Sequence, residues 1–189
     1  MTRRSETPEQ SAPAPQAGDD DLRKLRQPVP QEFDIRIAAD GCWYHEGGLI
    51  GRPALVKLFS SVLRREADGS FWLVTPVERG RIEVEDAPFV ITTVTFSEGT
   101  ISDDARDQVI TFRTNVDDEI TLAPDHPLTM RHPAGGGEDQ RPYVLVRDGL
   151  EALVARPVFY ELAERSATGP DGRLGVWSCG TFFPLEGDG

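Results

Sequence analysis

The sequence has few of the residues that build metal centres and cross-links. Its 189 residues include two cysteines and three histidines. Cys42 and Cys179 form no Cys-x-x-Cys motif, and the histidines have no His-x-x-x-His spacing. We therefore expect two reduced thiols, no bound metal and no cofactor.

The sequence also lacks the common catalytic and phosphate-binding motifs. It contains no Gly-x-Ser-x-Gly, no phosphate-binding loop and no dinucleotide-binding fingerprint. The glycines at 135–137 lack the lysine and the helix that would cradle a phosphate, and Ser178-Cys179-Gly180 has no partnered base in view. We expect a protein that is not an enzyme and assign no catalytic residue.

Positive charge and long apolar segments are scarce. Asp and Glu number 32 against 20 Lys and Arg, so the formal net charge is -12. Such a chain repels a phosphate backbone, which argues against non-specific nucleic-acid binding but leaves room for one small phosphate ligand in a local basic pocket. With no apolar run near ~20 residues and no signal-peptide core, we expect a cytoplasmic protein that is not bound to a membrane.

Residues 1–31 carry five prolines and no apolar period, which is typical of a disordered arm. Two domains are predicted after it, at 32–95 and 96–189. In the first, Phe33, Ile35 and Ile37 alternate with polar residues and indicate a strand. A helix is predicted over 52–66, with Pro53 at its first position.

The stretch from residue 71 to 90 predicts two strands joined by an Arg79-Gly80 turn, with Glu78 opposite Arg81. Residues 90–96 form a further strand of the first domain. In the second domain we expect strands at 108–114, 119–123, 143–147, 150–155 and 174–183 and a helix at 156–165. The fold class is α+β with mostly antiparallel sheets.

The two ends of the chain share an order of elements. Each reads strand, Asp-Gly, strand, Arg-Pro, amphipathic helix, Asp-Gly, strand, with Arg52-Pro53 corresponding to Arg156-Pro157. Both dipeptides are common, so the match also fits chance. We interpret it as a duplicated strand-strand-helix-strand unit, with a ligand site in the groove between the two copies.

Several segments together resemble DUF1285, a proteobacterial family of unknown function. They are residues 43–47 (WYHEG), 52–59 (RPALVKLF), 73–78 (LVTPVE), 84–89 (VEDAPF) and 156–162 (RPVFYEL). The resemblance runs from about Phe33 to Phe183. It implies two domains of duplicated elements, the second pleckstrin-homology-like. It also implies a site for a nucleotide-like ligand at the domain interface and a role in signalling, but no reaction.

Acidic residues cluster at the end of the 71–90 stretch. Glu85 and Asp86, with His45 brought close in space, could serve a hydrolase. The alternative is a solvated strand face paired with arginines. Asp86 stands out because it ends a strand, where its carboxylate could accept backbone N–H groups or meet the other domain.

Arginines at the repeat boundaries are the other candidates, because guanidinium groups can clamp a phosphate in an acidic protein. The alternative is ion pairing at helix starts and sheet edges. We predict a ligand-binding set in the inter-domain groove: His45, Arg52, Thr75, Glu78, Arg81, Asp86, Arg147 and Arg156.

Three functions remain open. The leading hypothesis is a regulatory or signalling protein that binds a small anionic or nucleotide-like ligand between its domains. A protein–protein adaptor is the second hypothesis, and a hydrolase using Glu85, Asp86 and His45 is the third.

Overall fold

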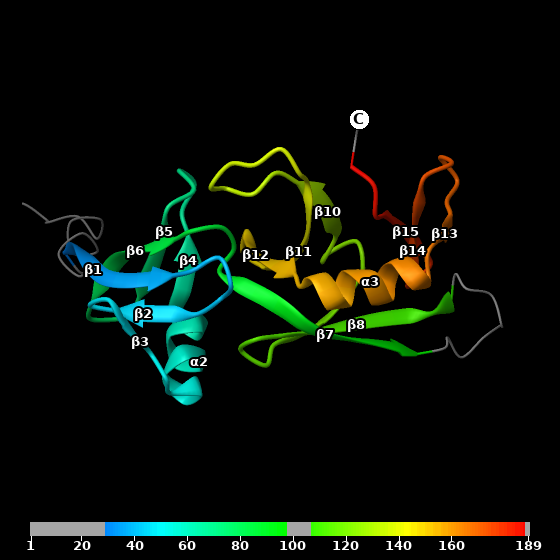
Figure 1. Ribbon diagram of the computed structural model, residues 1–189. Coiled ribbons are helices and arrows are strands. Elements are labelled where there is room, and N and C mark those ends of the chain that lie inside the picture. The colour runs from blue at the N-terminus through cyan, green and yellow to red at the C-terminus, as the bar shows by residue number, and fades with distance from the viewer. Residues whose placement is uncertain (1–28, 98–106, 188–189) are drawn as a thin grey trace, which may run out of the picture.

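The computed structural model describes residues 29–97 and 107–187. The predicted disordered arm lies outside them, except for its last three residues. Two domains lie side by side, each built on a six-stranded sheet and carrying one helix (Figure 1). All strand pairs among the described residues are antiparallel except β1 with β6 and β12 with β7. The fold is therefore α+β and mostly antiparallel, as expected.

The first sheet has the strand order β3-β2-β1-β6-β5-β4. Its strands and helix are β1 (Pro30–Ile37), β2 (Trp43–His45), β3 (Gly48–Leu49), α2 (Pro53–Val62), β4 (Leu63–Arg65), β5 (Phe71–Val74) and β6 (Arg79–Val84). β1 carries the predicted alternation, with Ile35 and Ile37 buried. Its register with β6 shifts between Glu32 and Arg36.

The turn between β5 and β6 lies at residues 75–78, so the predicted Arg79-Gly80 turn is wrong. Val74 pairs with Arg79, and Glu78 lies in the turn rather than opposite Arg81. Pro76 has a fixed φ suited to the second position of a β-turn. The Thr75 hydroxyl accepts the Glu78 N–H at 3.0 Å and so closes the turn.

Gly80 is a strand residue because another side chain lies against it. A Cβ at this position would overlap the ring of Phe33. The glycine therefore permits a close approach between β1 and β6 and does not supply a positive φ.

The first helix is shorter than predicted, because Leu63–Arg65 continues as strand β4 and pairs with β5. Pro53 occupies the first helical position, as expected. The apolar stripe of α2 is only partly covered: Phe59 and Val62 are half-buried, whereas Leu58 is 60% exposed. Arg65 consequently points from a sheet edge, not from a helix end.

The second sheet has the order β10-β11-β12-β7-β8-β9. Its strands are β7 (Phe89–Ser97), β8 (Val109–Thr114), β9 (Glu119–Thr121), β10 (Leu128–Arg131), β11 (Arg141–Arg147) and β12 (Leu150–Val154). Because β7 belongs to this sheet, the chain changes sheet at residues 85–88. The boundary predicted after residue 95 would have divided β7 and left most of it in the first domain.

Helix α3 (Arg156–Glu164) follows β12 and packs on β7 and on a third, three-stranded sheet. That sheet contains β13 (Ala167–Thr168), β14 (Leu174–Ser178) and β15 (Thr181–Pro184). The single strand predicted at 174–183 is thus a hairpin, turned by Cys179 and Gly180, both with positive φ.

The helices and strands of the predicted repeat follow each other in the same order in both domains. The strands do not pair with the same neighbours in the two domains. In the first domain the last strand, β6, returns to pair with β1. In the second domain β11 has β10 as its neighbour, and β14 and β15 stay in the separate sheet.

Polar contacts hold the two domains together. Arg147 donates to the Ser60 carbonyl of α2 at 2.8 Å and to Asp118 at 2.7 Å. Asn115 accepts the Val90 N–H and donates to the Gly41 carbonyl, both at 3.0 Å. Buried apolar residues from both sheets also form one core cluster. The domains are therefore fixed relative to each other at this interface.

Neither described helix has the length and apolar character needed to cross a membrane. Within residues 29–97 and 107–187, no three His, Cys, Asp or Glu side chains come together as metal ligands would.

Candidate functional site

A groove of about 610 Å³ lies where the first sheet meets the second. We call it the inter-domain groove. Its first-sheet wall includes Arg65, Phe71 and Val84, and its second-sheet wall includes Arg131 and Glu151. The linking segment contributes Asp86 and Pro88. The side chains thus come from β4, β5, β6, β10 and β12.

Asp86 is the most buried acidic residue of this groove, with 6% of its surface exposed. Its carboxylate accepts the Tyr143 hydroxyl at 2.8 and 2.9 Å and the Ala134 N–H at 3.1 Å. Arg131 and Arg141 lie 3.8 and 3.7 Å away. Asp86 therefore meets the other domain and accepts a backbone N–H, as its position at a strand end predicted.

Tyr143 is completely buried beneath Arg131, whose guanidinium carbon lies 3.5 Å from the ring centre. Burial raises the pKa of the Tyr143 hydroxyl well above its usual range, and the hydrogen bond to Asp86 and its negative charge add to this. Tyr143 therefore stays a neutral donor to the Asp86 carboxylate.

Two arginines from different domains converge on Glu151. Arg131 lies 2.9 Å from its carboxylate, and Arg65 lies 3.7 Å from it. Arg65 also donates to the Gly149 carbonyl at 3.0 Å. The side chains of Arg65 and Arg131 remain 38% and 30% exposed. The groove thus presents two guanidinium groups that ligand or solvent can still reach.

The eight predicted ligand-binding residues do not gather in one place. Two of them, Arg81 and Asp86, line the inter-domain groove. His45, Thr75 and Glu78 line a different cavity, of about 340 Å³, between α2 and the first sheet. We call this cavity the helix pocket.

The other three predicted residues line neither cavity. Arg147 is engaged in the domain contact with Ser60 and Asp118. Arg52 and Arg156 are exposed at the starts of α2 and α3. The correspondence of the two Arg-Pro dipeptides in sequence therefore does not bring their side chains to one site.

The residues of the hydrolase hypothesis also lie apart. Glu85 forms an ion pair with Arg36 and accepts the Ala39 N–H. Asp86 is held by Tyr143, and His45 lies at the helix pocket. These three groups form no acid–base set, so the geometry offers this hypothesis no support.

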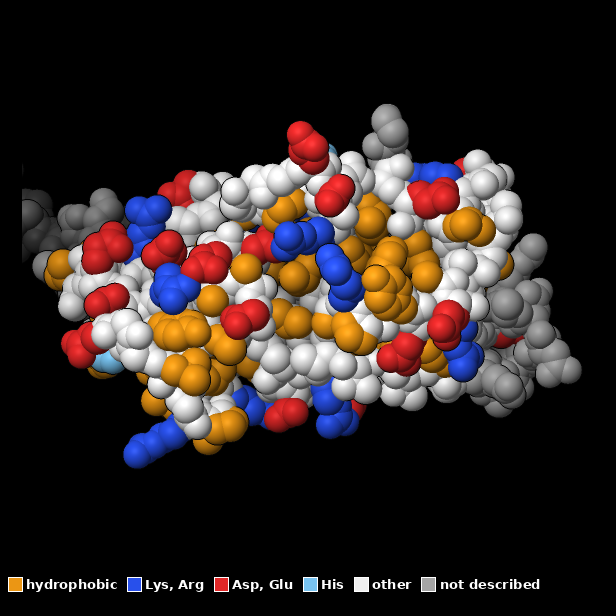
Figure 2. All heavy atoms as spheres, in the orientation of Figure 1, with side chains coloured by type: hydrophobic (Ala, Val, Ile, Leu, Met, Phe, Trp, Pro, Cys, Tyr) orange, Lys and Arg blue, Asp and Glu red, His pale blue; other side chains and the backbone are white. Residues whose placement is uncertain are grey.

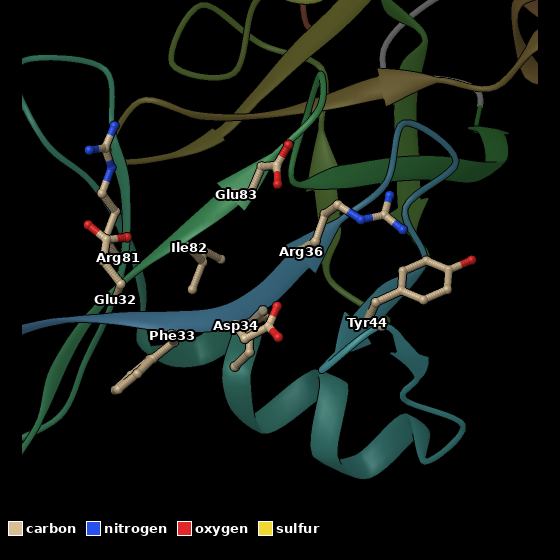
Figure 3. A pocket seen from close by; sticks show the side chains of 10 residues that line it. Glu32, Phe33, Asp34, Arg36, Tyr44, Arg81, Ile82 and Glu83 are labelled. Carbon is tan, nitrogen blue, oxygen red and sulfur yellow. The ribbon is translucent and has the colours of Figure 1, made fainter.

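The open face of the first sheet carries a third hollow, of about 460 Å³. Figure 3 shows the Arg81 and Glu83 side chains on the side of the sheet away from α2, and Phe33 on the helix side. Arg36 lies over the Tyr44 ring at 4.5 Å and pairs with Glu85. The Arg36 guanidinium is paired and the Tyr44 ring is covered by it, while the remaining charged residues of the hollow are exposed on an open sheet face. This face therefore fits a solvated surface better than a site.

Sequence reasoning missed Arg65, Phe71, Arg131 and Glu151. The apolar pattern at 52–66 predicts that Arg65 lies at a helix end, and no pattern in the sequence predicts β10, which carries Arg131. No local motif marks these residues. Only the pairing of distant strands brings them together.

Comparison with known proteins gives matches along most of the chain. Residues 24–87 match the N-terminal domain described as "Domain of unknown function (DUF1285)", and residues 88–185 match the C-terminal domain described as "Protein of unknown function (DUF1285)". No curated protein matches the chain.

Two solved structures are similar. A DUF1285 family protein from Silicibacter pomeroyi DSS-3 is 45% identical, with a TM-score of 0.74; the match covers 86% of this chain and 85% of that one. A DUF1285 family protein from Shewanella baltica OS155 is 24% identical, with a TM-score of 0.52; the match covers 70% and 91%, and it indicates the fold alone.

Proposed function

Because the chain belongs to the DUF1285 family, whose domains are described as being of unknown function, we propose a function from the groove itself. We propose that the protein binds a small anionic, nucleotide-like ligand in the inter-domain groove and acts in regulation or signalling. One observation carries the proposal. Arg65 and Arg131, from different domains, reach the same groove beside an apolar floor.

The guanidinium group of Arg65 has N–H donors that remain free, whereas Arg131 already donates to the His132 carbonyl and to Glu151, both at 2.9 Å. Arg65 uses Nη1 for both Gly149 and Glu151, so Nη2 and Nε have no partner among the described residues. Arg131 is fixed over Tyr143 and so is held in place before a ligand arrives. Planar guanidinium groups match phosphate and carboxylate oxygens, which makes an anion the natural ligand.

The acidic residues of the groove do not cancel this attraction. Asp86 is buried, and its negative charge is offset by the nearby guanidinium groups of Arg131 and Arg141. Its carboxylate also accepts a hydrogen bond from the Tyr143 hydroxyl. Glu151 shares its charge with both guanidinium groups of the groove. Glu83 also lines the groove, on the same strand as Arg81, and its side chain is exposed. An incoming anion therefore competes with the paired Glu151 and also meets the carboxylate of Glu83.

The floor accepts a flat apolar group. Phe71, Val84 and Pro88 line it, and the volume of about 610 Å³ falls in the range of small-molecule sites. The Arg65 guanidinium lies over the Phe71 ring, 5.5 Å from its centre, so a planar ring of the ligand packs beside this pair while the attached anion reaches the arginines. The groove therefore offers an apolar region for a planar base and arginines for a phosphate, which is why we propose a nucleotide-like ligand.

The same contacts supply a regulatory mechanism. The Arg65–Glu151 pair ties the first domain to β12, and the hydrogen bond from Arg65 to the Gly149 carbonyl ties it to the turn before β12. An anion that binds Arg65 replaces Glu151 and weakens this tie. The effect remains local, because Arg147 and Asn115 still join the domains.

A thermal-shift screen with AMP, ADP, GDP and pyrophosphate tests the proposal. At one hundred times Kd, a ligand stabilises by about 2.7 kcal/mol, which raises Tm by roughly 5–10 °C in a domain of this size. Arg65→Gln should abolish the shift. Arg113→Gln is the matched control, because Arg113 is exposed and pairs with Glu119 away from the groove.

No shift with any of the four ligands at millimolar concentration would count against the proposal. If a ligand raises the Tm of Arg65→Gln as much as that of the wild type, it binds outside the inter-domain groove. Both variants should first be compared without ligand, so that a loss of stability is not taken for a loss of binding.

A protein–protein adaptor is the second candidate. Tyr160 on α3 and Leu174 on β14 are 59% and 47% exposed, and Figure 2 shows hydrophobic side chains over α3. Both residues belong to the domain for which we expect a pleckstrin-homology-like character. Capture of one stoichiometric partner by the wild type, lost in Tyr160→Ser, would favour this candidate.

A further inference from the structure

The helix pocket is a second cavity with a different character from the inter-domain groove. It lies between α2 and the face of the first sheet formed by β1 and β5. Its interior is apolar, lined by Phe33, Ile35, Phe59, Val62 and Leu73. At about 340 Å³ it is large enough for a small molecule but not for a nucleotide with its sugar and phosphates.

The walls of the helix pocket are fixed by packing elsewhere. The Phe59 ring stacks on Trp43, with centroids 6.3 Å apart. The Phe33 ring is held against the backbone of Gly80. Leu73 is 3% exposed and pairs with Leu63 of β4. A cavity with walls held in this way needs little rearrangement to accept a ligand.

Two exposed carboxylates lie at the opening of the helix pocket. Glu46 and Glu78 line it together with His45, whereas Glu32 and Asp34 of β1 alternate with Phe33 and Ile35, so their side chains point to the opposite face of the sheet. No Lys or Arg is among the described lining residues. Glu46 and Glu78 are exposed and form no ion pair with any residue in 29–97 or 107–187. The negative charge at the opening is therefore not matched by the protein.

We propose that the helix pocket binds an organic cation with an apolar body, such as a primary amine that carries an aryl group. The apolar body replaces water against Phe33, Phe59 and Leu73. The ammonium group stays at the rim, near the carboxylates of Glu46 and Glu78, and the two aromatic rings add to its attraction.

The inference also separates residues that the sequence placed in one anion site. His45, Thr75 and Glu78 belong to the helix pocket, where the acidic rim repels an anion. Arg81 and Asp86 belong to the inter-domain groove. The two sites therefore differ in the sign of the ligand charge, and each can be tested without the other.

Nuclear magnetic resonance titration of the 15N-labelled full chain tests the proposal with three probes of similar shape. The probes are 2-phenylethylamine, the neutral 2-phenylethanol and the anionic 3-phenylpropionate. We expect the amine to bind with a Kd of about 1 mM, the range for so small a ligand. Amide shifts should centre on Phe33, Val62 and Leu73.

The double variant Glu46→Gln and Glu78→Gln tests whether the carboxylates at the opening of the helix pocket contribute to binding of the amine. Two partly solvated ion pairs are worth about a tenfold change in affinity. The variant should therefore bind the amine about as weakly as the alcohol, and its affinity for the alcohol should not change. Glu161→Gln with Glu164→Gln, on exposed positions of α3, removes the same charge elsewhere and should leave amine binding intact.

Three outcomes would overturn the inference. They are equal affinity for amine and alcohol, tighter binding of the anion, and shifts that centre away from the helix pocket. Absence of binding by all three probes at about ten times the expected Kd would also overturn it. None of these results depends on whether the inter-domain groove binds an anion.

Discussion

Replacing Asp86 by alanine removes the group on which the inner wall of the inter-domain groove depends. The Tyr143 hydroxyl loses its acceptor in a completely buried position, and the Ala134 N–H loses its partner. Arg131 and Arg141 lose their nearby negative charge. The substitution therefore leaves unpaired groups on the second domain while it removes a side chain from the linking segment.

The expected cost follows from how buried each group is. A buried hydroxyl without a partner costs about 1–3 kcal/mol. The two arginine side chains are 30% and 48% exposed, so water compensates most of their loss and each contributes at most about 1 kcal/mol. We expect Asp86→Ala to lower the free energy of unfolding by about 3 kcal/mol in total.

Urea denaturation followed by tryptophan fluorescence measures this change. Tyr143→Phe should cost only about 1 kcal/mol, because Asp86 keeps its contacts with Ala134, Arg131 and Arg141. In the double variant the hydroxyl and its acceptor are both absent. Its cost should be smaller than the sum of the single costs by about 1–2 kcal/mol.

Asp86→Asn is the conservative control, since its amide oxygen can still accept both hydrogen bonds. A cost below about 1 kcal/mol for Asp86→Ala would refute the reasoning, because it falls under that of one unpaired buried hydroxyl. Strict additivity of the two single costs would refute it as well.

Three further predictions concern stability. The pKa of Tyr143 is raised in the folded state, so its contribution to the free energy of unfolding is complete below about pH 10 and is lost as the pH rises beyond that. In urea denaturation at increasing pH, the wild type should lose up to about 1.4 kcal/mol per pH unit more than Tyr143→Phe, and an equal loss in both proteins would contradict this. Gly80→Ala should lower the stability measured by thermal unfolding by about 1–3 kcal/mol, because the added Cβ overlaps the Phe33 ring. The Cβ of Gly51→Ala meets open space, so this control should be nearly neutral, and equal melting temperatures of the two variants would be inconsistent with the packing. Asn115→Ala should cost about 1–3 kcal/mol in urea, because it removes one hydrogen bond across the domain contact, to Gly41, and one within the second domain, from Val90. An unchanged midpoint would show that these bonds do not contribute to stability.

Local patterns in the sequence predicted many of the elements. The alternation around Ile35 and Ile37 indicated β1, and Pro53 marked the start of α2. The β-branched run at 90–96 indicated β7. These signals succeed because strand alternation and helix starts depend on near neighbours in the chain.

Features that depend on distant residues were not predicted. Gly80 looks like a turn glycine until Phe33 is known to lie over it. Arg65 looks like a helix-end residue until β4 pairs with β5. The order of elements suggested a repeat, but it could not show that β6 pairs with β1 while β15 stays away from β11.

The candidate site was predicted least well for the same reason. Asp86 was identified because a strand-end carboxylate is visible locally. Arg131 and Glu151 reach the groove only through the pairing of β10, β11 and β12. Arg52 and Arg156 correspond in sequence, but each remains exposed at the start of its own helix.

Titration of the 15N-labelled full chain with ADP, followed by nuclear magnetic resonance, tests the central claim most directly. If the inter-domain groove binds the ligand, the first amides to shift should be those of Ser70, Phe71, Val84 and Ala134, which line it. The Arg65→Gln variant should lose these shifts. Shifts confined to the open face of the first sheet, around Arg36 and Tyr44, would contradict the claim, as would no shift at millimolar ADP.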